Sequence, residues 1–275
     1  MNAGAAIVES LFWQSPKSNK IEPLLALSWR QETPTAVLVT LRQGVQFTNG
    51  EPMNADAVVH SIQVFADNKL SPAYARVAEA IERAEKVDDS TVRVRLHYPS
   101  PTIGLALSQI YITPPKYWAQ VGAEAYGQKP IGTGPFRFVE FRRGESIKLT
   151  KNTDYWKKGR PYLDAIDIRI IDNRSTRLLA FQTGEFDFTY PADVTVPLMR
   201  DVKANAPKAI CNLYATGVSS NLVVNRSSPP FDNAEIRKAM SLSLDRDSFV
   251  KILSEGQATI GGAMLPLPEG EWGMP

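Results

Sequence analysis

The chain has 275 residues, which is enough for one large domain or two of ordinary size. Hydrophobic residues make up 43% of it and charged residues 22%, a balance typical of a globular protein with a buried core. The formal net charge of +2 gives no sign of a surface for nucleic acid or anionic membrane, and no apolar run reaches the roughly 18 residues of a membrane-spanning helix.

The first regular elements are an extended segment and a helix. Residues 35–47 alternate between apolar and polar side chains, which predicts a strand, and an Asn-Gly turn at residues 49–50 closes it. A helix is predicted over residues 54–66, with Asn54 as its N-cap and its apolar residues on one face. Because His60 lies opposite this apolar stripe, we expect it to be exposed to solvent.

Antiparallel strands are predicted next. Residues 86–91 form a turn into a strand over 92–96, where valines and a leucine alternate with arginines as on a half-solvated strand. Residues 136–141 and 146–150 form a second hairpin around a charged turn with a glycine.

Strands and helices alternate in the rest of the chain. We predict strands at 166–170, 186–188 and 221–225, and helices at 174–183, 233–244 and 246–255. Gly184 and Gly256 follow two of these helices, as glycines commonly do. The strand, helix and strand between residues 166 and 188 suggest a βαβ unit, so the chain is assigned to the α/β class.

Residues 130–136, PIGTGPF, contain two glycines and invite comparison with a phosphate-binding loop. A P-loop needs a Gly-Lys-Ser/Thr sequence that opens a helix, because backbone amides and a lysine neutralise the phosphate. Here Pro135, which has no amide hydrogen, follows Gly134, and strand residues come next. The motif therefore predicts a tight turn that leads into a hairpin.

Residues suited to catalysis or metal binding are scarce. The chain has two histidines, His60 and His97, one cysteine, Cys211, and no G-x-S-x-G motif. We therefore expect no enzymatic activity, no metal and no cofactor, and only a triad assembled from distant segments stays open. One cysteine allows no intrachain disulfide, so cysteine content does not fix the redox compartment.

Seven motifs occur along the chain in an order that a known family shares. The most specific is LRQGVQFTNGEPMNADAV at residues 41–58, which is similar to the family pattern LRxGVxFxDGxPxxAxDV. The others are LALSW at 25–29, PIGTGPF at 130–136, NTDYW at 152–156, GEFD at 184–187, PFDNAEIRKA at 230–239 and LDR at 244–246. Together they resemble family 5 of the extracellular solute-binding proteins of ABC transporters, the dipeptide, oligopeptide and nickel-binding family.

The resemblance implies an α/β fold of the periplasmic-binding-protein type II, in which two lobes joined by a hinge enclose the ligand. We assign residues 1–10 and 116–215 to the first lobe, 11–115 to a small subdomain inserted in it, and 216–275 to the beginning of the second lobe. Family members are usually much longer, and the chain stops in the loop EGEWGMP. We therefore interpret the chain as a C-terminally truncated fragment that lacks most of the second lobe.

The function implied by the resemblance is that of the solute-binding component of an ABC importer. Such a component captures a peptide or similar small solute by closure of its lobes and delivers it to the permease subunits in the membrane. Peptide, nickel chelate, opine, sugar and glutathione all stay open as ligands, and no nucleic acid is expected. The alternative is the ligand-sensing module of a cytoplasmic transcriptional regulator, which an upstream helix-turn-helix domain would indicate.

Four residues are candidates for contact with the ligand. Tyr74 lies near a tyrosine that faces the ligand in peptide-binding members of the family, and a role in the core is its alternative. Trp13, Trp118 and Arg137 are further candidates, although buried tryptophans are more often part of a core than of a cleft.

The two ends of the chain lead to further expectations. The first residues, MNAGAAIVESLFW, lack the basic and apolar regions of a signal peptide. An importer component would then have lost its leader from this numbering and would lie in the periplasm or be lipid-anchored outside the cytoplasm. Near the other end, the two helices expose an apolar patch, which we expect to fold back on the first lobe or to be covered by a second copy in a homodimer. We expect the patch to consist of Ile236, Met240, Phe249, Val250 and Leu253.

Overall fold

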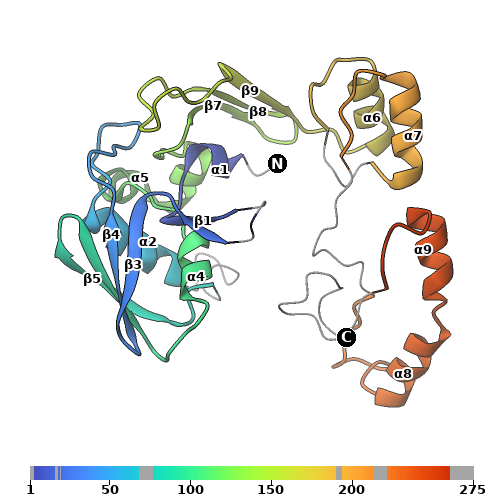
Figure 1. Cartoon of the computed structure of the whole chain (residues 1–275), viewed down its shortest axis with the longest axis horizontal. Helices are drawn as coiled ribbons and strands as arrows, with labels where there is room; N and C mark the ends of the chain where they lie inside the picture. The colour runs from blue at the N-terminus through green and yellow to red at the C-terminus, as the bar shows by residue number, and fades with distance from the viewer. Residues whose placement is uncertain are drawn as a thin grey trace. The chain divides into compact units, whose positions relative to one another are not determined.

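The computed structural model describes residues 3–15, 18, 20–67, 77–189, 194–212 and 222–260. The chain divides into two units, of which the first ends at Ile170 and the second begins at Ile171. All the strands in the described part of the chain belong to the first unit, whereas the regular elements described in the second unit are helices (Figure 1).

The first unit is built on three antiparallel sheets (Figure 1). A short hairpin joins β1 (Phe12–Gln14) to β2 (Ile21–Pro23). The four-stranded sheet has the order β3-β4-β6-β5, and the three-stranded sheet has the order β7-β8-β9. Their strands are β3 (Ala26–Thr33), β4 (Ala36–Leu41), β5 (Ile81–Asp88), β6 (Thr91–Leu96), β7 (Phe136–Arg142), β8 (Ser146–Lys151) and β9 (Ala165–Arg169).

These strands confirm most of the expectations for this region. The turn into β6 and the hairpin of β7 and β8 lie where the alternation of side chains placed them. The extended segment is shorter than expected, because β4 ends at Leu41. Gly44, with φ of 75°, breaks the regular backbone, and only an isolated bridge from Gln46 to Pro52 follows.

Helices of the first unit are α1 (Gly4–Ile7), α2 (Ala55–Ala66), α4 (Ile103–Gln109) and α5 (Pro115–Gln128). The predicted start of α2 is confirmed, because the side-chain oxygen of Asn54 accepts a hydrogen bond from the amide of Ala57 at 3.3 Å. Glu51 does the same for α5, since its carboxylate accepts from the amides of Lys116 and Tyr117 at 3.0 Å each.

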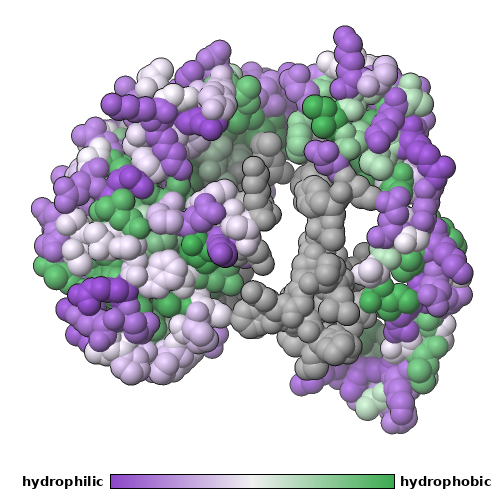
Figure 2. Space-filling view, in the orientation of Figure 1, coloured by the Kyte–Doolittle hydropathy of each residue, from purple (hydrophilic) through white to green (hydrophobic). Residues whose placement is uncertain are grey.

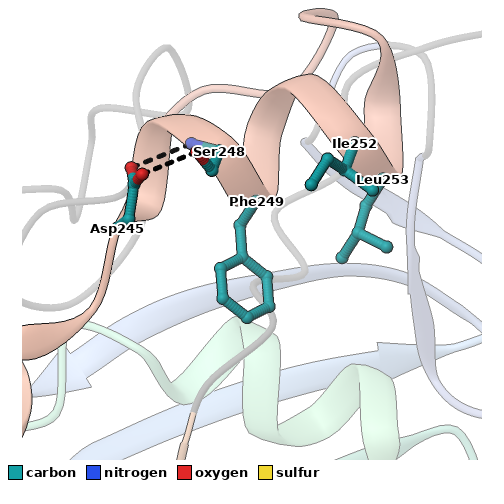
Figure 3. Close-up of a pocket in the computed structure, with 5 residues that line it drawn as sticks. All are labelled: Asp245, Ser248, Phe249, Ile252 and Leu253. Atoms are coloured by element: carbon teal, nitrogen blue, oxygen red, sulfur yellow. Dashed lines mark hydrogen bonds between the residues drawn. The ribbon is translucent and has the colours of Figure 1, made fainter.

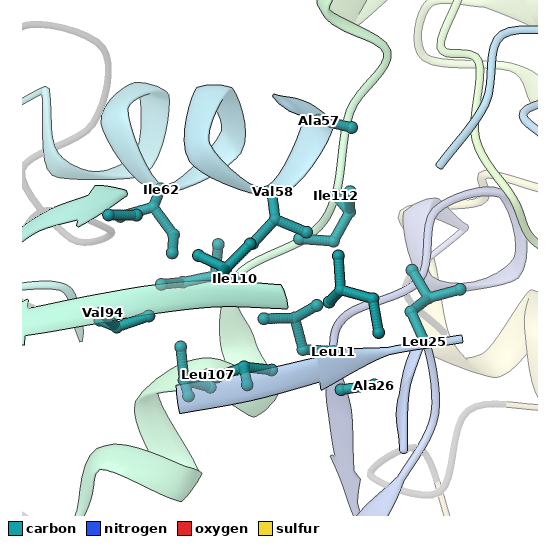
Figure 4. Packing of buried hydrophobic residues seen from close by; sticks show 14 of the residues in the cluster. Leu11, Leu25, Ala26, Ala57, Val58, Ile62, Val94, Leu107, Ile110 and Ile112 are labelled. Carbon is teal, nitrogen blue, oxygen red and sulfur yellow. The ribbon is translucent and has the colours of Figure 1, made fainter. Parts of the chain in front are cut away.

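The main core lies between α2 and the inner face of the four-stranded sheet. Val37, Val39, Val92 and Val94 alternate with outward residues and are fully buried. Ile62 on α2 points into the same cluster, and residues around Ile110 and Leu107 close it (Figure 4). Each such side chain contributes about 1.5–3 kcal/mol through its removal from water, so this cluster dominates the stability of the unit.

The outward face of this sheet is charged. Arg93 on β6 donates to both carboxylate oxygens of Glu32 on β3, at 2.6 and 2.9 Å, and Arg95 donates to Glu85 on β5 at 2.9 Å. The expected half-solvated strand is thus confirmed: the ion pair of Arg95 joins neighbouring strands, and that of Arg93 reaches across β4 to β3.

The turn at residues 130–136 is a close backbone contact with the N-terminal segment. The amide of Gly134 donates to the carbonyl oxygen of Ile7 at 2.8 Å, and the Asn152 side chain donates to the carbonyl of Gly134 at 2.9 Å. A Cβ atom at Gly132 or Gly134 would lie against the Ile7 carbonyl, closer than non-bonded atoms approach. The two glycines therefore serve packing, which confirms the motif as a corner of the scaffold.

The second unit contains four helices in the described residues: α6 (Arg174–Gln182), α7 (Val196–Asn205), α8 (Ala234–Ser243) and α9 (Arg246–Ser254). Each of three predicted helices has a side-chain N-cap, from Asn173, Asn233 and Asp245. Gly184, with φ of 79°, follows α6 as expected.

Two predicted strands of this unit are wrong. Residues 186–188 form no strand, and neither do residues 222–225, while residue 221 lies outside the described part. Phe188 is 60% exposed and Val223 is 87% exposed, so neither segment has a neighbouring strand in the described residues to bury its apolar side chains. The expected βαβ unit is accordingly not formed by these segments.

Candidate functional site

Trp13 is the most accessible of the candidate ligand-binding residues that the structure describes. It lies on β1, opposite Glu22 of β2, and its neighbour Phe12 is fully buried. Because successive side chains of a strand point to opposite faces, Trp13 is turned outward and is 40% exposed. An exposed indole on a short sheet can stack on a solute.

Trp118 lies within an aromatic cluster of the first unit. Its ring centroid is 4.8 Å from that of Tyr126 and 5.7 Å from that of His60 on α2. The Tyr126 hydroxyl donates to the carbonyl of Ile131 at 2.6 Å, which fixes this cluster to the start of the glycine turn. The contacts of Trp118 thus give it a packing role between α2 and α5, and a ligand contact stays a prediction.

His60 belongs to this cluster, so its expected exposure is wrong. The side chain is half-buried, and Nε2 is buried without a hydrogen-bond partner among the described residues. Burial lowers the pKa of His60, and the negative charge of Glu51 partly offsets this effect. The face opposite the apolar stripe of α2 is covered here by α5, which the periodicity of α2 alone does not show.

Arg137 on β7 is already paired. Its guanidinium donates to the Asn152 side chain at 3.1 Å and to the carboxylate of Asp154 at 2.7 Å. Asp154 is largely exposed, so an anionic solute could compete for the arginine only by displacing this ion pair. Arg137 therefore also holds the NTDYW segment beside β7.

Three of the four candidates lie in the described part of the chain, and they do not contact one another there. Tyr74 lies outside the described residues. Between Trp13, Trp118 and Arg137 there is no hydrogen bond, ion pair or ring contact in the described part of the chain. Nor do its described residues include a group of three or more His, Cys, Asp or Glu side chains that could hold a metal ion.

Two hollows are found on helices of the second unit. One side of α9 carries a hollow where Phe249, Ile252 and Leu253 lie together (Figure 3). Its polar groups are occupied, since the Asp245 carboxylate accepts from the Ser248 amide at 3.0 Å and from the Ser248 hydroxyl at 2.6 Å. This hollow has the character of a helix packing face, with no polar group available to orient a solute.

The other hollow lies between α6 and α7 and is more polar. The Gln182 amide donates to the carboxylate of Asp201 across it at 3.0 Å. Its lining residues are Arg174, Ser175, Leu178, Leu179, Gln182, Leu198 and Asp201. These residues belong to none of the sequence motifs, because they come from two helices whose contact no motif indicates.

Comparison with known proteins identifies the family to which the chain belongs. The sequence pattern of the bacterial extracellular solute-binding proteins, family 5, matches residues 20–273. The chain belongs to this family. It has the α/β fold of roughly half of a periplasmic-binding-protein-like family 5 structure, and the family consists of solute-binding proteins, not enzymes.

Three relatives show the extent of the match. The glutathione-binding protein GsiB of Pectobacterium atrosepticum is 31% identical over 233 residues, 83% of this chain and 44% of the relative. The structure of MoaA from A. tumefaciens R10 with mannopinic acid has a TM-score of 0.80 and 26% identity, over 92% of this chain and 52% of the other. DppA from Helicobacter pylori, in complex with the peptide STSA, has a TM-score of 0.78 and 26% identity, over 96% and 56%.

The chain thus spans about half the length of these relatives. No helix in the described residues has the length and apolar character needed to cross a membrane.

Proposed function

We propose that this chain is part of the solute-capturing component of an ABC importer, which takes up a peptide or a similar small solute and delivers it to the permease. The observation that supports this most is the match of the family pattern over residues 20–273. The relatives named above include a glutathione-binding protein and structures that hold an opine or a peptide, so the proposed solute class is small and rich in carboxylate and amide groups.

The assigned lobes, namely residues 1–10 with 116–215, 11–115 and 216–275, stay part of this proposal. So do the permease as partner, a location outside the cytoplasm, and contacts from Tyr74, Trp13, Trp118 and Arg137. The family pattern describes extracellular proteins, which supports the location. The alternative of a cytoplasmic regulator rests on the resemblance alone, and no described residue favours it.

Solute binding is best tested by titration calorimetry and by tryptophan fluorescence with glutathione, di- and tripeptides and an opine. If an accessible indole contacts the solute, titration will change the emission of the native chain, and Trp13→Phe will remove most of that change. Trp29→Phe is the matched control, because Trp29 is not among the proposed solute contacts and its ring packs edge-on against Phe12. If no member of the panel binds even at millimolar concentration, the proposal fails for this chain.

A further inference from the structure

The first unit contains two separate cores that the N-terminal segment connects. Ile7 and Val8 pack with Phe136 and Leu149 of the three-stranded sheet. A few residues later, Leu11 and Phe12 belong to the core beneath the four-stranded sheet. Glu9 therefore lies between the two cores, at the place where a hinge between the sheets would be expected.

A second segment crosses beside the first. The amide of Ile112 donates to the carbonyl of Glu9 at 2.9 Å, and Ser10 forms an antiparallel bridge with Tyr111. Two paired segments thus link the sheets. A short two-stranded connection of this kind can twist unless side chains hold it in place.

The side chain of Glu9 supplies such a restraint. It is only 6% exposed, and its carboxylate accepts three hydrogen bonds. The Tyr155 hydroxyl donates to Oε1 at 2.6 Å, while the Trp156 indole and the Thr133 hydroxyl donate to Oε2 at 2.8 and 3.0 Å. We call these four residues the Glu9 cluster; its donors come from the turn before β7 and from the segment after β8.

Charged groups around the Glu9 cluster extend it toward the four-stranded sheet. The Arg42 guanidinium, which follows β4, and the Lys157 ammonium lie 4.6 and 4.7 Å from the centroid of the Trp156 ring. Burial raises the pKa of Glu9, whereas its three hydrogen bonds and the charge of Lys157 act in the opposite direction. Three hydrogen bonds fix the orientation of the buried Glu9 carboxylate. Removal of this carboxylate would leave its three donors without that acceptor.

We propose that Glu9 is a positioning residue that fixes the four-stranded sheet against the three-stranded sheet, so that the first unit moves as one rigid body when solute is captured. Only the last clause rests on the proposed function. The fixed relation of the two sheets is a property of the free protein and can be measured without any solute.

The test is the distribution of distances between spin labels on the two sheets, measured by pulsed electron paramagnetic resonance. Val87→Cys on β5 and Arg143→Cys in the turn between β7 and β8 supply exposed label sites, in a Cys211→Ser background. We expect a narrow distribution for the native cluster and at least a two-fold broader one for Glu9→Ala.

Glu9→Gln is the matched variant. Its amide oxygen can accept from Trp156 and Thr133, and its amide nitrogen can donate to the Tyr155 hydroxyl, which rotates to accept. This variant should therefore keep the narrow distribution. Ile62→Val removes one methyl group from the main core and leaves the residues of the Glu9 cluster unchanged. This variant should also keep the narrow distance distribution, because a general loss of stability does not loosen the connection between the two sheets.

Hydrogen exchange gives a second readout on the same variants. In Glu9→Ala, the amides of Thr48 and Ile112, which donate within the connection between the two sheets, should exchange at least ten-fold faster, while those in the pair β4 and β6 stay protected. If Glu9→Ala does not fold, Tyr155→Phe and Trp156→Phe replace it, and each should broaden the distribution to a smaller degree. A folded variant without the hydrogen bonds of the cluster that keeps the native distance distribution would overturn the proposal.

Discussion

One helix of the first unit, α2, and one of the second, α8, begin in the same way but differ in what they bury. α2 of the first unit and α8 of the second both start at an asparagine cap and both are amphipathic. Val58 and Ile62 of α2 are 0% and 1% exposed, whereas α8 and α9 bury no residue, and Leu242 and Ile252 are 77% and 72% exposed. Figure 2 shows hydrophobic side chains at the surface of these helices among hydrophilic ones.

This difference shows that the ends of a helix and its stability are determined by different features. Caps and amphipathic spacing decide where a helix begins and ends, but stability comes from a complementary surface that receives the apolar face. Of the predicted apolar patch, Ile236, Phe249 and Leu253 are exposed, and Met240 and Val250 are half-buried. What covers this patch, the first lobe or a second copy, stays a prediction.

The largest contrast is expected from one change made in both units. Ile62→Ala leaves a cavity in a filled core and should lower the free energy of unfolding by about 2–5 kcal/mol. Ile252→Ala removes the same atoms from an exposed position and should change it by less than about 0.5 kcal/mol. Urea unfolding followed by circular dichroism measures both. Equal losses would show that the face of α9 is buried in solution.

Two glycines of the first unit should respond with opposite signs. Gly134→Ala forces a methyl group against the carbonyl of Ile7 and should cost about 1–3 kcal/mol of stability. Gly127→Ala in α5 meets no atom within 4 Å and should stabilise the protein by up to about 1 kcal/mol, because alanine favours the helix. The comparison is made by thermal unfolding, and a neutral Gly134→Ala would contradict the packing role of the turn.

A smaller contrast is expected from the two caps. Asn54→Ala removes the acceptor of the Ala57 amide and should lower the free energy of unfolding by about 1 kcal/mol. Asn233→Ala removes the same kind of bond, to the Glu235 amide at 2.8 Å, from a helix that buries no side chain. We expect faster hydrogen exchange within α8 and no shift of the main unfolding midpoint. A clear shift of that midpoint would show that α8 unfolds together with the first unit.

These contrasts also show what the sequence can predict. The start of α2, the hairpin of β7 and β8, and the corner at Gly132 and Gly134 depend on neighbours in the chain or on backbone geometry, so patterns reveal them. Contacts between segments that are distant in the chain could not be predicted from the sequence. The strand predicted at 186–188 has the right composition, but composition does not supply a pairing partner.

The site is less accessible to such reasoning than the fold. Residue type is what suggests a ligand contact for Trp118 and Arg137, and the structure gives both of them neighbours that explain their presence without a ligand. No sequence pattern indicates Glu9, because its three donors follow it at distant positions in the chain and no short motif contains them. A buried carboxylate is recognised by its partners, which only the folded chain assembles.

The smallest expected effect concerns the histidine whose exposure was predicted wrongly. Burial lowers the pKa of His60 below its ordinary value of 6.5, so the unfolded chain binds a proton more readily than the folded one. The free energy of unfolding should therefore fall as the pH drops below about 6.5, and the loss should level off below the pKa of the folded state. His60→Gln should flatten this part of the pH profile. Unfolding midpoints in urea between about pH 5 and pH 8 would decide the matter, since a profile that His60→Gln does not alter would mean that α5 leaves the imidazole open to water.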